Sequence, residues 1–239
     1  MATVLLVRHG LTAMTGPVLA GHTPGVHLDD RGRAQADALA GRLRPVPLAA
    51  VVTSPLERCT ETAGAVAAGR NGLAPTPDAR LAEVRYGDWT GRSLKELARE
   101  PLWKVVQQHP SAAVFPGPEG EGLAQTQVRA VEAVREWDAK VAEASGPDAV
   151  WLACSHGDVI KALLADALGL HLDLFQRILV DPCSVSVIRY TETRPFVLRV
   201  NDTGGDVAGL LPPAGKGRRR RAASGDAPVG GGAGPPARS

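Results

Sequence analysis

The chain has 239 residues, of which 44% are hydrophobic, 4% aromatic and 22% charged, and its formal net charge is +2. This length suits one large α/β domain or two small ones, and the near-neutral charge argues against a chain-wide nucleic-acid surface. The three cysteines are widely spaced with no C-x-x-C pair, which favours reduced thiols and a cytoplasmic location. No apolar run approaches the ~20 residues of a membrane span, and no basic region precedes the short apolar run at the start, so neither a membrane anchor nor a signal peptide is expected.

The first predicted element is a buried strand over residues 3–7, rich in Val and Leu. Arg8, His9 and Gly10 follow it directly. Ligands of open α/β sheets bind just beyond the carboxyl ends of strands, so a site is expected here. Arginine offers a planar charged fork suited to phosphate, and a neutral imidazole can act as a nucleophile near pH 7. The loop over 11–28 contains several Gly and Pro residues and is expected to wall this site.

A second strand end carries another arginine. A helix is expected over 30–43, and a buried strand over 49–53 follows it. Ser54 is then expected to cap the next helix, with Pro55 in its first turn. Arg58 would lie in that first turn, beside free N–H groups and the positive end of the helix. A cation is unfavourable there unless an anion is bound nearby.

The middle of the chain departs from this regular alternation. Glu83 precedes a segment over 84–91 that carries glycines and aromatic residues. Several prolines then divide the next region into short helices and loops. A long helical pattern runs over 122–144.

The last third of the folded region returns to strands. A buried strand over 149–154 ends at Ser155-His156-Gly157, and a helix follows. Strands over 183–190 and 195–200 form a closing hairpin. The element order predicts an α/β fold, a three-layer α/β/α sandwich with a mixed, mostly parallel sheet.

The residues from about 210 onward differ in composition from everything before them. Residues 212–239 are mostly Gly, Pro, Ala and Arg without apolar periodicity, which is typical of disorder. We therefore expect a folded domain over 1–205 and a disordered Gly/Pro/Arg-rich tail over 206–239. The basic run from Lys216 to Arg221 could bind nucleic acid, but a solubilising role is favoured.

Two arginines and two histidines follow strand ends: Arg8, His9, Arg58 and His156. Carboxyl ends of parallel strands share one sheet edge, so these side chains are expected to meet there and to form a site for a dianion, most simply phosphate. No set of metal ligands accompanies them. A histidine in such a pocket could attack phosphorus while the other cationic groups neutralise the phosphoryl oxygens. The leaving alkoxide needs a proton donor, for which Glu83 is the candidate, although the spacing also allows a surface carboxylate.

Four motifs in chain order resemble those of the histidine phosphatase superfamily, the phosphoglycerate mutase-like proteins. They are R-H-G at 8–10, S-x-L-x-R at 54–58, L-x-E-x-x-[FY]-G-x-W-x-G at 81–91 and S-H-G at 155–157. The resemblance covers about residues 3–200. It implies a phosphoglycerate mutase-like fold and a metal-independent phosphomonoester hydrolase without a cofactor.

The resemblance also implies a role for each matching residue. His9 would be the phosphorylated nucleophile and Glu83 the proton donor, while Arg8, Arg58 and His156 would bind phosphate. Many relatives continue R-H-G with E-T-x-x-N. Here the glutamate is replaced by Leu11 and the asparagine by Thr15. A threonine hydroxyl can still donate a hydrogen bond, so Thr15 is expected to contact phosphate.

Three other interpretations stay open. A mutase of the same superfamily is disfavoured because the insertion that such enzymes carry between Glu83 and His156 is missing. A non-catalytic phosphate-binding protein would not need the nucleophile. Cys183 and Arg189 have the spacing of cysteine-dependent phosphatases, but the residues between them alternate as a strand. A small phosphorylated metabolite is the expected partner, and no pattern predicts an oligomeric state.

Overall fold

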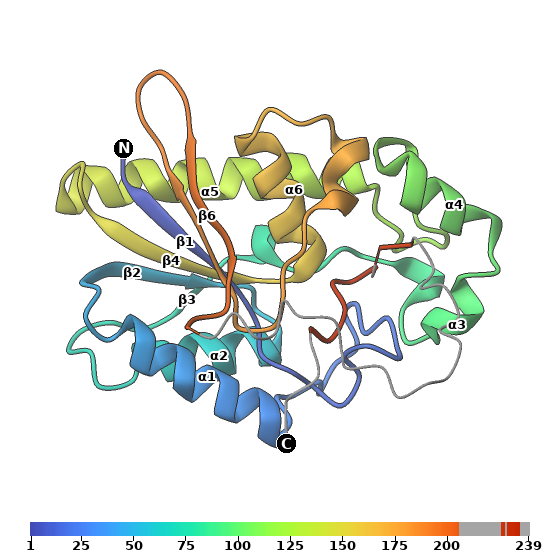
Figure 1. Ribbon diagram of the computed structural model, residues 1–239, viewed down its shortest axis with the longest axis horizontal. Helices are drawn as coiled ribbons and strands as arrows, with labels where there is room; N and C mark the ends of the chain where they lie inside the picture. Colours follow the sequence, from blue (N-terminus) through green and yellow to red (C-terminus); the bar gives the residue numbers. More distant parts are fainter. Residues whose placement is uncertain (206–225, 228, 235–239) are drawn as a thin grey trace.

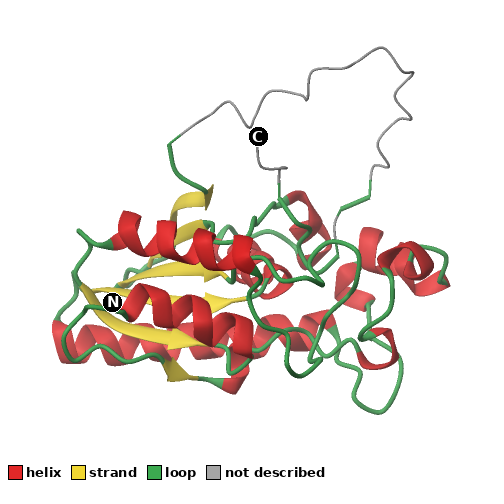
Figure 2. Ribbon diagram, turned by 90° about the horizontal axis from the view of Figure 1, so that it is seen from below, coloured by secondary structure: helices red, strands yellow, loops and turns green. Residues whose placement is uncertain are grey.

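The computed structural model describes residues 1–205, 226–227 and 229–234. Within them, one six-stranded sheet lies between two layers of helices (Figures 1 and 2). The strands are β1 (Thr3–Arg8), β2 (Leu48–Thr53), β3 (Thr76–Pro77), β4 (Val150–Ser155), β5 (Val185–Arg189) and β6 (Phe196–Asp202). The helices are α1 (Asp30–Leu43), α2 (Glu57–Ala67), α3 (Leu94–Leu97), α4 (Pro101–Gln108), α5 (Leu123–Ser145) and α6 (Gly157–Ala167).

The sheet has the strand order β3-β2-β4-β1-β5-β6. The first four strands in this order are parallel to their neighbours. β5 and β6 close the sheet as an antiparallel hairpin, with β5 also antiparallel to β1. The predicted mixed, mostly parallel sheet and three-layer sandwich are therefore confirmed, and β3 is a short additional strand at one edge.

Side chains of β1 alternate between two apolar cores, as the period of a strand requires. Val4 and Leu6 belong to the larger core, which contains residues of α5 and α6. Leu5 and Val7 belong to the smaller core, which contains residues of α1 and α2. The helices lie on both faces of the sheet accordingly (Figure 2). None of the described helices combines the length and apolarity needed to cross a membrane.

The helix after β2 begins later than predicted. α2 starts at Glu57 with Leu56 as its N-cap, which makes no side-chain capping bond. Ser54 therefore does not cap the helix. Its hydroxyl accepts a bond from the Leu56 N–H at 3.3 Å and lies 2.8 Å from His156 Nε2. The capping prediction was wrong because the serine is held by a partner from another strand end. Arg58 still falls in the first turn of the helix.

Part of the predicted tail lies against the domain. Residues 226–227 and 229–234 run between the loop after β1 and helix α4 (Figure 1). The remaining residues of the predicted tail, including the basic run from Lys216 to Arg221, lie outside the described residues. The boundary at residue 205 stays a prediction.

Two glycines of α1 allow a matched test of how this helix supports the loop after β1. A Cβ on Gly32 would lie 2.0 Å from the Leu11 carbonyl oxygen, whereas nothing lies within 4 Å of a Cβ on Gly41. We expect Gly32→Ala to lower the free energy of unfolding by about 1–3 kcal/mol through overpacking. Gly41→Ala should raise it by about 0.5–1 kcal/mol, because alanine restricts the unfolded chain more than glycine.

Urea denaturation of the two variants and the unmodified chain measures both effects. Equal changes in the two variants would contradict the close contact between α1 and the loop.

Candidate active site

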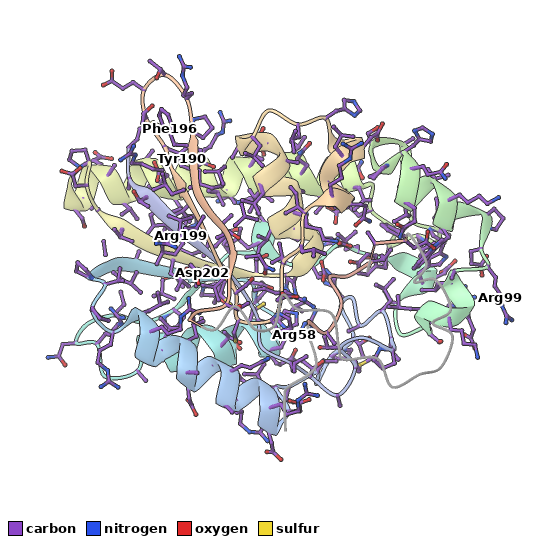
Figure 3. All side chains as sticks on the ribbon, viewed as in Figure 1. Arg58, Arg99, Tyr190, Phe196, Arg199 and Asp202 are labelled. Atoms are coloured by element: carbon purple, nitrogen blue, oxygen red, sulfur yellow. The ribbon has the colours of Figure 1, made fainter. Side chains whose placement is uncertain are left out.

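Sheet register brings the first two site elements together. β1 and β4 are parallel neighbours that pair Arg8 with Ser155, so His9 and His156 both follow the same edge of the sheet. Their ring centroids lie 5.2 Å apart. β2 pairs with the other side of β4, and α2 after it carries Arg58 to the same edge, where Figure 3 labels it. The predicted convergence of these residues at one edge is found in the structure.

His9 has a defined tautomer. Its Nδ1 lies 2.7 Å from the Gly10 carbonyl oxygen, and since a carbonyl only accepts, Nδ1 carries the proton. Nε2 is left with a lone pair, which accepts a bond from Arg58 Nε at 3.3 Å. Burial lowers the pKa of His9 well below its usual value, and the charges of Arg58 and Arg8 lower it further. His9 is therefore a neutral imidazole with an unprotonated Nε2 at the pocket.

His156 lies on the other side of Arg58. Its Nδ1 is 3.3 Å from Arg58 Nη2, and since guanidinium groups only donate, Nδ1 accepts. Nε2 then carries the proton and donates to Ser54 Oγ at 2.8 Å. Burial, followed by the charges of Arg58 and His9, lowers the pKa of His156 well below its usual value. Both histidines are thus neutral near pH 7.

The two arginines are buried and only partly satisfied. Each is 1% exposed. Arg58 Nη2 donates to the Gly21 carbonyl at 2.8 Å, and Arg8 Nη1 donates to the Val180 carbonyl at 2.8 Å. Among the described residues, Arg8 Nε and Arg58 Nη1 have no hydrogen-bond partner. Buried donors of this kind usually have a partner, and charged donors fit an anion best.

Glu83 is buried beside the histidines. Its Oε2 lies 3.8 Å from His156 Nδ1, and its Oε1 accepts the Val84 N–H at 3.0 Å. Burial and the nearby charge of Asp158 raise the pKa of Glu83 to about 7, against the lowering effect of Arg58. A carboxyl group with this pKa is populated in both protonation states near neutrality. The alternative of a surface carboxylate is wrong for this residue.

Thr15 also reaches the cavity, from the loop after β1. It lines the same space as His9, Arg58 and Glu83. Its hydroxyl lies 2.9 Å from that of Thr12 and accepts the Thr12 N–H at 3.1 Å. All six predicted site residues therefore gather at the same edge of the sheet.

Several residues at the site were not predicted from the sequence. The sequence pattern at Ser54 indicates a helix cap and gives no sign that this residue belongs to the site. Asp158 accepts bonds from Tyr86 Oη at 2.9 Å and Lys161 Nζ at 3.1 Å. Its position directly after S-H-G is the one feature of the sequence that could have indicated a place in the site. His22, in the loop after β1, contacts the Glu83 carbonyl oxygen through Nε2 at 2.7 Å. The described residues hold no group of three or more His, Cys, Asp or Glu arranged for a metal ion.

Comparison with known proteins defines the class. The model of the histidine phosphatase superfamily (branch 1) matches residues 4–203. Phosphoserine phosphatase 1 of Hydrogenobacter thermophilus is 30% identical over 214 residues, which cover 85% of this chain and 93% of that protein. A probable phosphoglycerate mutase GpmB of Yersinia enterocolitica is 30% identical over 219 residues, covering 90% and 97%. The structure of Bacillus stearothermophilus YhfR is 29% identical with a TM-score of 0.73, covering 84% and 98%.

The chain therefore belongs to the histidine phosphatase superfamily, and its fold is that of the phosphoglycerate mutase-like phosphatases. Relatives with phosphatase names and relatives with mutase names both match over nearly their whole lengths. Membership thus supports hydrolase activity on a phosphorylated substrate. It does not identify the substrate, because the relatives differ in the substrates that their names give.

The raised pKa of Glu83 depends partly on Asp158, which gives a test of the site's electrostatics. Replacing Asp158 by asparagine removes a negative charge that favours protonation of Glu83. We expect Asp158→Asn to lower the pKa of Glu83 below about 7, measured by carbon-13 NMR titration of its carboxyl group. Asp166→Asn, on the same helix but paired with Arg135 at 3.2 Å, should leave this pKa unchanged. An unchanged or higher pKa in Asp158→Asn would contradict the assignment.

Proposed function

We propose that the protein is a phosphomonoester hydrolase that acts on a small phosphorylated metabolite through a phosphohistidine at His9. The observation that carries this proposal is the unprotonated Nε2 of His9 beside Arg58. The unpartnered Nε of Arg8 and Nη1 of Arg58 support it, because they would meet the negative oxygens of a phosphoryl group. The hydroxyl of Thr15 would donate to the phosphate, and His156 would do so once its Nδ1 takes up a proton.

The reaction would proceed in two displacements. In the first, His9 Nε2 attacks phosphorus, the ester P–O bond breaks, and protonated Glu83 gives its proton to the leaving alkoxide. In the second, water attacks the phosphohistidine, Glu83 takes a proton from this water, and the P–N bond breaks to release orthophosphate. Arg8 and Arg58 stabilise the charge on the phosphoryl oxygens in both steps. No metal ion takes part in this scheme.

Two alternatives have less support. A mutase must protect its phosphoenzyme from water, and the chain lacks the insertion expected between Glu83 and His156 for that reaction. Because the Yersinia relative is named a probable phosphoglycerate mutase, mutase activity is also tested below. A protein that only binds phosphate gains nothing from a neutral, correctly protonated nucleophile.

We also propose a cytoplasmic location for the enzyme, which is supported by three buried cysteines that form no disulfide.

Hydrolysis of p-nitrophenyl phosphate in EDTA tests the chemistry. We expect the unmodified chain to release phosphate and His9→Ala to lose at least about 10³-fold in kcat, because the covalent route is removed. His27→Ala is the matched control, since His27 lies in the exposed part of the loop after β1 and contacts Glu61. Turnover that survives in His9→Ala, or that stops in EDTA and returns with a divalent metal ion, would contradict the mechanism.

The products from 3-phosphoglycerate separate hydrolase from mutase. We expect orthophosphate and glycerate from this substrate, because the chain lacks the insertion expected of mutases between Glu83 and His156. Conversion to 2-phosphoglycerate without release of orthophosphate would establish a mutase instead.

A further inference from the structure

The described C-terminal residues 226–227 and 229–234, here called the strap, are held to the domain by side chains of α4. Trp103 Nε1 donates to the carboxylate of Asp226 at 3.0 Å. The side-chain amide of Gln107 bonds Ala227 in both directions, to its carbonyl at 2.9 Å and from its N–H at 2.8 Å. These contacts fix the strap beside the pocket rather than elsewhere on the surface.

The next residues of the strap enter the pocket. Val229 is 2% exposed and lines the cavity together with Gly230 and Gly232. The Gly230 N–H donates to Asp158 Oδ2 at 2.9 Å. The carbonyl oxygens of Gly230, at 3.3 Å, and Gly231 accept bonds from the guanidinium of Arg8. The backbone of the strap therefore uses donors of an arginine that the proposed function assigns to phosphate.

Only glycine permits this approach. Gly231 has a φ of +82°, and a Cβ there would lie 2.9 Å from Gly157 Cα and 3.1 Å from Arg8 Cζ. Gly230 has a φ of +72°, and its Cβ would lie 3.0 Å from a methyl group of Leu19. Backbone and pocket thus touch at positions where a side chain would force them apart.

The docked strap leaves little space for a ligand. The cavity that remains has a volume of about 30 Å³, which is room for about two water molecules. A phosphomonoester is larger than two water molecules, so it would compete with the strap for this space. We propose that the strap is an intramolecular occupant of the substrate pocket, which competes with orthophosphate and phosphomonoesters for Arg8. This inference rests on the phosphate site of the proposed function but not on turnover.

Competition of this kind weakens the apparent affinity for a ligand by the fraction of molecules in which the pocket is free. If the strap is docked in about 90% of molecules, the apparent Kd rises about tenfold. Because the strap is part of the same chain, dilution does not release it. Ligand must displace it, or another binding event must hold it away.

Undocking the strap in the full chain tests the proposal. Gly231→Val cannot keep the positive φ and the contact with Gly157, so the strap should leave Arg8. We expect calorimetry to give a Kd for orthophosphate that is about three- to tenfold lower, and the KM for p-nitrophenyl phosphate to fall by the same factor with kcat unchanged. Gly205→Val is the matched control, because Gly205 also has a positive φ but no neighbour within 4 Å of its Cβ.

A second variant acts at the other end of the strap. Gln107→Ala removes both bonds to Ala227 without entering the pocket, and should lower the Kd for orthophosphate in the same direction by a smaller factor. Unchanged or weaker phosphate binding in both variants would overturn the competition, and weaker binding would indicate a strap that completes the site.

Hydrogen exchange of the strap amides gives an independent readout. Saturating orthophosphate should speed the exchange of Gly230, whose N–H is bonded to Asp158 in the docked strap. Slower exchange would show that the strap closes over the anion, which contradicts competition. Chains that bind phosphate as expected but release none from p-nitrophenyl phosphate would contradict the hydrolase and leave the competition standing. Chains that do not bind phosphate at all would contradict both.

Discussion

The parallel pairing of β1 with β4 is the constraint on which the site depends. This register places Arg8 opposite Ser155, so that the histidine after each strand emerges at the same level of the sheet edge. A shift of one residue in either strand would turn alternate side chains to the opposite face. It would exchange the apolar residues of the two cores and move the strand-end side chains with them. Apolar burial on both faces of the sheet therefore also fixes the geometry of the two histidines.

Buried positive charge is the second organising feature. Arg8 and Arg58 are removed from water, which is costly unless their donors are satisfied. Backbone carbonyls satisfy part of each guanidinium, and within the described residues Arg8 Nε and Arg58 Nη1 are left without a partner. Burial, reinforced by these charges, lowers the pKa of both histidines and keeps them neutral. Burial also raises the pKa of Glu83 to about 7. The groups proposed as nucleophile, acid and anion site are thus prepared by one arrangement of burial and charge, before any ligand arrives.

The sequence predicted the strand ends and what they carry, because strand patterns and strand-end motifs are local signals. It predicted the layers of the fold for the same reason. It failed where a residue's partner is remote: Ser54 has the local signal of a helix cap, but a histidine from another strand end holds it. The position of Asp158 between Tyr86, Lys161 and the strap likewise depends on elements that meet only in the folded chain.

The strap shows the physical limit of a compositional rule. A Gly-rich segment has few apolar side chains to bury, so its composition predicts disorder. The absence of side chains is also what lets its backbone carbonyls reach a buried guanidinium next to Gly157.

Carbonyl dipoles attract a guanidinium less strongly than the charged oxygens of a phosphate do, because a full negative charge interacts more strongly with a buried cation than a partial charge does. The strap also loses chain entropy when it docks. A dianion can therefore displace it, whereas a neutral molecule of similar shape has no electrostatic advantage over the carbonyls. An occupant built from glycine backbone thus favours phosphorylated ligands over their dephosphorylated products at the same pocket.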